Sequence, residues 1–99
     1  MIIETAHISI EPGREEEFIA ALHDGKKVLE QAEGFVHLHV SRGIERESVV
    51  LLQIMWKTLE NHTVDFRQGP LFPQWRAVIG PFFAEGQSPA VEHWTPVDL

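Results

Sequence analysis

The run VVLLQIMW, residues 49–56, is apolar on both of the faces that a β-strand presents. Because successive side chains of a strand point to opposite faces, one face would carry Val50, Leu52, Ile54 and Trp56, and the other Val49, Leu51 and Met55. Both sets need cover from water. A chain of 99 residues forms one domain with one core. We therefore expect its own helices to cover one face of the sheet and a second copy of the chain to cover the other.

The spacing of apolar residues predicts four strands and two helical regions. The strands are expected at residues 2–10, 35–42, 48–57 and 90–97. A Pro-Gly break and three glutamates at 15–17 favour the start of a first helix, whose apolar stripe includes Phe18, Leu22 and Leu29. Gly34 is its expected C′ residue. In the strand after it, alternation predicts one face with Val36, Leu38 and Val40, and another with Phe35, His37, His39 and Ser41.

The second helical region is expected in two pieces. Thr58 is the predicted N-cap of the first piece, and one side of that piece would carry Leu59, His62, Thr63 and Phe66. Gly69-Pro70 interrupts it, and Gly80-Pro81 limits a second piece with Leu71, Phe72, Trp75, Val78, Ile79 and Phe82 at helical spacing. Pro96 marks the last strand as an edge strand or an exit from the sheet.

The order β-α-β-β-α-β predicts an α+β, ferredoxin-like fold with one four-stranded antiparallel sheet and helices on one face. We expect a single domain over residues 1–99. The uncovered face predicts a homodimer that packs sheet against sheet, a dimeric α+β barrel.

Composition excludes several classes of function. The chain has no cysteine, so a metal would need His, Asp or Glu ligands. Its net charge is −7 and its eight Lys and Arg are scattered, so we expect no nucleic-acid binding and no attraction to anionic membranes. No apolar run approaches the ~20 residues of a membrane span. The N-terminus lacks the basic region of a signal peptide, and we expect a cytoplasmic protein. A small neutral or weakly acidic organic ligand fits this surface.

Several segments together resemble a known family. They are EPGREEEF at the first helix, EGF before the second strand, WKTLENH after the third strand, FRQGPLFPQWR in the second helical region and VEHW near the end. With the strand and helix order, they are similar to the antibiotic biosynthesis monooxygenase family of dimeric α+β barrels.

The resemblance implies a dimer with a pocket between sheet and helices in each subunit. It also implies oxidation of polycyclic phenols or quinols by dioxygen, without metal, flavin or haem. Relatives that degrade haem carry an Asn, a Trp and a His at the places of His7, Phe66 and Arg76, so we expect no haem degrader. Quinol-oxidising relatives often have two histidines four apart, where this chain has His62 and Phe66.

His62 is the predicted catalytic base, because it shares a helix side with apolar residues and its pKa lies near working pH. Such a base would turn a phenol into a phenolate, which gives an electron to dioxygen more readily. A helix histidine that is hydrogen-bonded only to backbone and solvent is the alternative. Phe66, Phe72, Trp75 and Arg76 are predicted to shape the substrate pocket; a plain core and a solvated arginine are their alternatives.

His37 and His39 would point the same way from one strand. Two histidines are too few for a metal site, although His7 and His93 lie on other strands. We therefore interpret His37 and His39 as polar residues of the substrate pocket or the dimer contact, with no metal bound.

The sequence thus predicts a cofactor-independent monooxygenase that oxidises a small electron-rich aromatic, a quinol or a polyketide phenol. A non-catalytic ligand-binding or stress-response dimer of the same fold is the main alternative. A metalloprotein with histidine ligands is the other.

Overall fold

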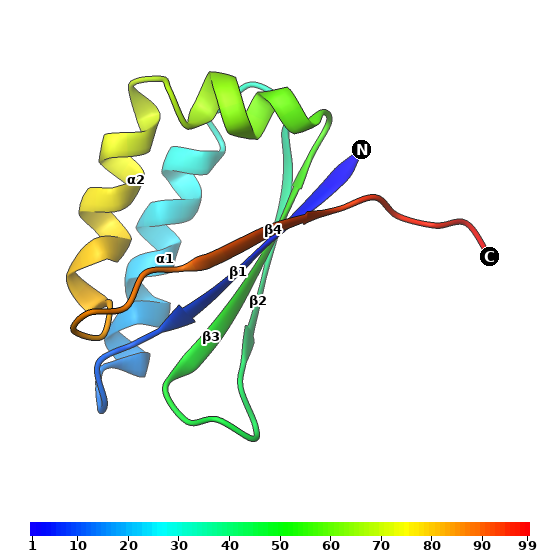
Figure 1. Ribbon diagram of the computed structural model, residues 1–99. Coiled ribbons are helices and arrows are strands. Elements are labelled where there is room, and N and C mark those ends of the chain that lie inside the picture. The colour runs from blue at the N-terminus through cyan, green and yellow to red at the C-terminus, as the bar shows by residue number, and fades with distance from the viewer.

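The computed structural model describes residues 1–99 and has the predicted order of elements (Figure 1). The elements are β1 (Ile2–Ser9), α1 (Glu15–Leu29), β2 (Phe35–Arg42), β3 (Val49–Trp56), the π-helical turn η1 (Asn61–Phe66), α2 (Leu71–Ile79), the 3-10 turn η2 (Gly80–Phe82) and β4 (Ala90–Trp94). The predicted α+β, ferredoxin-like fold is confirmed. None of the helices is both long enough and apolar enough to cross a membrane.

The sheet has the strand order β2-β3-β1-β4, and all its pairs are antiparallel. β1 and β3 are central, and β4 is an edge strand, as Pro96 indicates. Figure 1 shows α1 and α2 on one side of the sheet, while no element lies on the other side. We call the side toward the helices the inner face and the other side the outer face.

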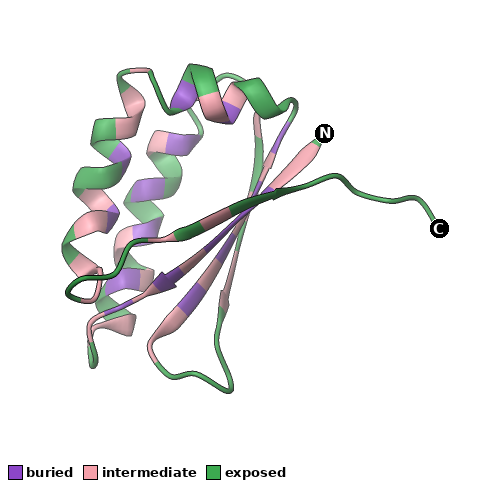
Figure 2. Ribbon diagram, viewed as in Figure 1, coloured by how far each residue is buried: buried purple, intermediate pink, exposed green.

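The core lies on the inner face (Figure 2). β3 alternates along its whole length as predicted: every second side chain is buried, namely Val50, Leu52, Ile54 and Trp56. From the first helix, Phe18, Leu22 and Leu29 pack against this surface. A fully buried side chain of this size stabilises the fold by about 1.5–3 kcal/mol, so these contacts hold the helices against the sheet.

A β-bulge at the start of β2 reverses part of the predicted pattern. The register shifts between Phe35 and His37, so that Phe35 pairs with Trp56 and packs on the core. Their rings meet edge to face with centroids 6.1 Å apart. Val36 is the extra residue and is exposed. The prediction that Phe35 shares a face with His37 and His39, and Val36 with Leu38 and Val40, is wrong, because a bulge adds one residue to the alternation.

The connection from α1 to β2 also differs from the prediction. α1 ends at Leu29, so Gly34 is not its C′ residue. Gly34 instead has φ +80° in the turn that enters β2, and a Cβ there would lie 2.0 Å from Oδ1 of Asn61. Asn61 needs this space, because its Oδ1 accepts the Thr58 N–H while the Thr58 Oγ1 accepts the Asn61 N–H, both at 3.1 Å. Helical structure begins at Leu59, before η1, so Thr58 is the N-cap of this segment as predicted.

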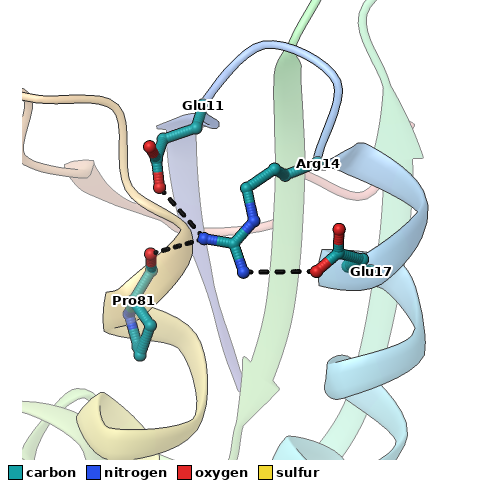
Figure 3. A network of polar contacts seen from close by, with 4 residues as sticks. All are labelled: Glu11, Arg14, Glu17 and Pro81. Carbon is teal, nitrogen blue, oxygen red and sulfur yellow. Dashed lines mark hydrogen bonds and ion pairs between the residues drawn. The ribbon is translucent and has the colours of Figure 1, made fainter.

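Arg14 connects the start of α1 with the turn that follows α2 (Figure 3). Its guanidinium donates to Glu11 at 3.1 Å, to Glu17 at 3.2 Å and to the carbonyl oxygen of Pro81 at 3.3 Å. It also lies 4.5 Å from the centroid of the Phe82 ring. Exposed ion pairs of this kind add little stability, so the contact mainly links the start of α1 with the turn after α2.

We expect Gly34→Ala to destabilise the protein far more than Gly13→Ala. Both glycines have positive φ, but nothing lies within 4 Å of a Cβ built at Gly13. Gly13→Ala should therefore cost only the backbone strain, about 1–2 kcal/mol, and Gly34→Ala should cost this plus the displacement of Asn61. Urea unfolding measures both free energies. Equal losses would contradict the Asn61 contact.

Candidate functional site

A cavity of about 190 Å³ lies between the inner face of the sheet and the segments η1 and α2. Its floor comes from three strands: Glu4, Ala6, Ile8, Leu52, Ile54 and Val91. Its opposite wall comes from η1, α2 and the turn between them: His62, Phe66, Arg67, Phe72, Trp75, Arg76 and Ile79. Ser88 and Pro89 lie before β4 on its rim. Most of the lining is apolar, so its few polar groups would orient a ligand.

Glu4 is the only acidic side chain in the cavity lining, and only 6% of it is exposed. Alternation along β1 places it on the inner face, in the row that contains Ala6 and Ile8. The indole N–H of Trp56 donates to Oε1 of Glu4 at 3.0 Å. Nε2 of His62 lies 3.3 Å from the same oxygen. These two partners make a buried carboxyl tolerable, because burial without hydrogen bonds costs several kcal/mol.

His62 is buried, with 2% exposed, and both of its ring nitrogens have partners. Nε2 faces Glu4, and Nδ1 lies 2.8 Å from Nε2 of His93. The ring also stacks on Trp56 with centroids 5.4 Å apart and planes 20° apart. His93 is opposite Glu4 in the β1–β4 register and is exposed at the edge of the sheet. Glu4, His62 and His93 thus form a continuous row from the cavity to the surface.

The π-helical turn η1 positions the helical side of this row. The N–H of Arg67 donates to the carbonyl oxygen of His62 at 2.9 Å, a spacing of five residues instead of the four of an α-helix. The widened turn brings both His62 and Arg67 to the cavity. Short π-helical segments often occur at functional sites.

Two arginines bring positive charge to the cavity. The guanidinium carbon of Arg67 lies 5.3 Å from the centroid of the Phe72 ring, and that of Arg76 lies 6.0 Å from it. Arg76 also lies 5.3 Å from the ring of Phe83. Neither arginine forms an ion pair with an acidic residue. In a chain with net charge −7, two arginines without acidic partners on an apolar cavity favour an anionic ligand group.

Burial shifts the pKa values in the row toward the uncharged forms. Burial raises the pKa of Glu4 from 4.5 to about 7, although the Trp56 hydrogen bond and the charge of Arg67 act in the opposite direction. Burial lowers the pKa of His62 from 6.5 to about 4, and the charges of Arg67 and His93 add to this. Burial and Arg67 also lower the pKa of His93. Near neutral pH His62 is uncharged, and Glu4 is protonated in part of the molecules and ionised in the rest.

The structure brings together five of the predicted site residues: His62, Phe66, Phe72, Trp75 and Arg76 all line the cavity. It does not bring His37 and His39 there. They lie on the outer face of β2, opposite Met55 and Gln53, with ring centroids 6.4 Å apart. They do not line this cavity, because they alternate along β2 with Leu38 and Val40, which pack on the core. A place in the dimer contact stays a prediction. No group of three or more metal-ligating side chains forms.

Three residues of the site escape the sequence patterns. Glu4 carries a signal that could have found it, because an acidic residue in the inner row of an apolar strand is rarely buried without a function. Arg67 and His93 carry no such signal. The place of Arg67 at the cavity depends on the π-helical turn. The role of His93 depends on its contact with His62, which lies 31 positions away in the chain.

We expect Glu4→Gln to gain stability relative to the unchanged protein as pH rises. The pKa of Glu4 is raised from 4.5 to about 7 in the folded parent protein. Its contribution to the free energy of unfolding is therefore complete below pH 4.5 and is lost as pH rises through 7. At about 1.4 kcal/mol per pKa unit, the difference between variant and parent should change by about 3 kcal/mol. The lowered pKa of His62 destabilises both proteins as pH falls from 6.5 to about 4. It therefore cancels in the difference between them.

Unfolding free energies from about pH 4 to about pH 8 test this. Glu45→Gln, at an exposed turn position, is the control and should keep a constant difference. A constant difference for Glu4→Gln would contradict the burial of an ionisable Glu4.

Comparison with known proteins agrees with this architecture. The sequence model of the antibiotic biosynthesis monooxygenase family matches residues 1–78. The uncharacterized protein YczJ of Bacillus subtilis is 31% identical over 97 residues, which cover 98% of this chain and 100% of YczJ. A crystal structure of a candidate antibiotic biosynthesis monooxygenase from Bordetella bronchiseptica has a TM-score of 0.91 and 35% identity, with 97% of this chain and 96% of that chain covered.

A more distant structure shares the fold. It is a monooxygenase from the gene ActVA-Orf6 of Streptomyces coelicolor in complex with nanaomycin D, with a TM-score of 0.80 and 13% identity over 99% of this chain and 88% of that one. The match of the family model over most of the chain, with the 31% and 35% identities, shows that the chain belongs to the antibiotic biosynthesis monooxygenase family.

Proposed function

We propose that this protein is a monooxygenase that oxidises a small electron-rich aromatic, a phenol or quinol of one or two rings, with dioxygen. The observation that carries the proposal is an apolar cavity that holds an ionisable acid–imidazole pair, Glu4 and His62, opposite two arginines without acidic partners. Family membership supports the reaction class.

The volume of the cavity limits the substrate. An engineered cavity of about 150 Å³ in another protein binds benzene, whereas typical drug-sized pockets start at about 300 Å³. The cavity of about 190 Å³ therefore fits one aromatic ring or a compact pair of rings. This size favours a smaller substrate than the polycyclic phenols that the family resemblance implies.

The chemistry begins with removal of a proton. Both nitrogens of His62 are occupied, by Glu4 and by His93, so the Glu4 carboxyl is the group of the pair that is left to receive the proton of a phenol. His62 then acts with Glu4 as a pair, and this modifies the prediction of a lone histidine base. Arg67 and Arg76 would stabilise the resulting phenolate, because charge interactions are strong in an apolar site.

The phenolate then reduces dioxygen. One oxygen atom enters the ring as a new carbonyl group and the other leaves as water, and the aromatic C–H and O–H bonds supply all four electrons. The proton removed at the start is returned when the O–O bond breaks. For such a reaction the protein needs to bind the phenol, to remove its proton and to return a proton to the departing oxygen atom.

We propose that the protein works as a homodimer packed through its outer face. That face carries Ile3, Leu51, Met55 and Trp94, and half of the Trp94 side chain is exposed. Members of the family generally form dimers. His37 and His39 would then belong to the contact between subunits. The cytoplasmic location and the lack of nucleic-acid binding stay predictions from the sequence.

A non-catalytic ligand-binding protein with the same cavity is the alternative. The contact between the Glu4 carboxyl and the His62 imidazole on the cavity wall favours the enzyme, because an adjacent acid and base are what proton transfer needs.

We expect the purified protein to consume oxygen with at least one member of a panel of one- and two-ring phenols and quinols. Glu4→Gln and His62→Gln should each slow this by about 10²-fold, because each removes proton transfer. His23→Gln, an exposed histidine on α1, should leave the rate unchanged. Oxygen-electrode rates measure all four proteins. Ligand binding without oxygen uptake would support the non-catalytic alternative.

We expect Leu51→Glu to convert the dimer to a monomer, because it places a charge in the middle of the outer face. Ile44→Glu, in the β2–β3 turn where Ile44 is 91% exposed, should leave the dimer intact. Sedimentation velocity measures both. A monomeric parent protein would refute the packing of sheet against sheet.

A further inference from the structure

We propose that Glu4, His62 and His93 form a proton relay that connects the substrate cavity with solvent at the edge strand β4. The inference rests on the proposed function for its substrate, but its geometry stands without it. The relay gives His93, which no sequence pattern assigns, the role of the group that exchanges protons with water.

The contacts give the relay its path. Oε1 of Glu4 and Nε2 of His62 are 3.3 Å apart, and Nδ1 of His62 and Nε2 of His93 are 2.8 Å apart. One proton lies in each of these two contacts, so a change at one end requires a change of tautomer in His62. Glu4 and His62 are buried, whereas His93 is exposed. The row therefore runs from the buried carboxyl of Glu4 through the buried imidazole of His62 to the exposed imidazole of His93.

Few charged side chains outside the row of Glu4, His62 and His93 face the cavity. The other charged side chains on the cavity are Arg67, from the turn after η1, and Arg76, from α2. Arg67 acts on all three groups and lowers the pKa of each. Glu92, the neighbour of His93 on β4, pairs with Thr5 on the outer face and so points away from the row. No carboxylate other than Glu4 lines the cavity to hold a proton within it.

The transfer balances in protons. At the start Glu4 carries a proton on Oε1 and His62 carries one on Nδ1. The ligand hydroxyl gives its proton to Oε2 of Glu4, the proton on Oε1 moves to Nε2 of His62, and the proton on Nδ1 of His62 moves to Nε2 of His93. Three bonds to hydrogen form and three break, and the positive charge appears on His93 while the phenolate remains beside the arginines.

The same steps in reverse complete the cycle. When the reduced oxygen atom leaves as water it needs a proton, and His93 returns one through His62 to Glu4. The row regains its first state without rotation of the His62 ring. This suits a residue whose ring is stacked on Trp56 and packed beside Phe66, at a centroid distance of 6.3 Å.

The relay is tested without substrate by nitrogen NMR of the imidazoles from about pH 5 to about pH 8. As Glu4 ionises, His62 should change from the Nδ1–H to the Nε2–H tautomer, because a carboxylate needs a donor. In Glu4→Gln the change should be lost, and the pKa of His93 should fall because a neutral amide no longer favours its charged form. A His62 tautomer that is constant across this range in the parent protein would overturn the relay.

Turnover tests the same relay when a substrate has been found. His93→Ala should slow oxygen uptake by about 10²-fold, and added imidazole should restore a large part of the rate by occupying the open edge position. His23→Ala is the control and should show neither effect. Full activity in His93→Ala, or a loss that imidazole does not restore, would overturn the relay and leave the oxygenase proposal in place.

Failure of the relay and failure of the proposed function give different results. If no phenol or quinol is oxidised, the proposed function fails, and the tautomer measurement still decides whether Glu4, His62 and His93 exchange protons.

Discussion

The burial of one carboxyl, Glu4, is the constraint on which the site depends. β1 is a central strand, and its inner row must be apolar to build the core, yet this row contains an acid. The structure accommodates the acid with the indole N–H of Trp56 and the imidazole of His62. A glutamine or an aliphatic residue would satisfy the fold at lower cost, because replacing a buried charge by an apolar group is often neutral or stabilising. The carboxyl is therefore better explained by chemistry than by stability.

The local structure around this acid follows from the same requirement. His62 reaches Glu4 because the chain after β3 turns back over the sheet, and the Thr58–Asn61 cap begins that turn. The cap needs room, which Gly34 provides. The π-helical hydrogen bond from Arg67 to His62 then widens the turn and brings a guanidinium to the same cavity. A glycine in one loop and a cap in another thus determine where an imidazole lies.

The sequence predicted the order of strands and helices and the place of His62, but not the contacts of His62 with Glu4 and His93. The reasons are physical. Burial produces periodicity, so the alternation of Leu52 and Ile54 and the stripe of Phe18 and Leu22 predict strands and helices directly. A bulge breaks this relation, since one added residue in β2 exchanges the faces of Phe35 and Val36. Contacts across the sheet leave no periodic trace. His62 was predictable from its own helix, whereas its pairing with His93 exists only once β4 joins β1.

The edge strand β4 carries two consecutive residues that serve the two faces of the sheet. His93 points inward to His62, and Trp94 lies on the outer face, where its indole N–H donates to Oγ1 of Thr5 at 2.7 Å. Neighbouring side chains on a strand point to opposite faces but are attached to one backbone, so a contact that fixes the backbone at Trp94 also fixes it at His93. A second subunit that packs against Trp94 would therefore also restrain His93. In this fold the assembly of two sheets and the alignment of a proton path are expected to depend on the same five-residue strand.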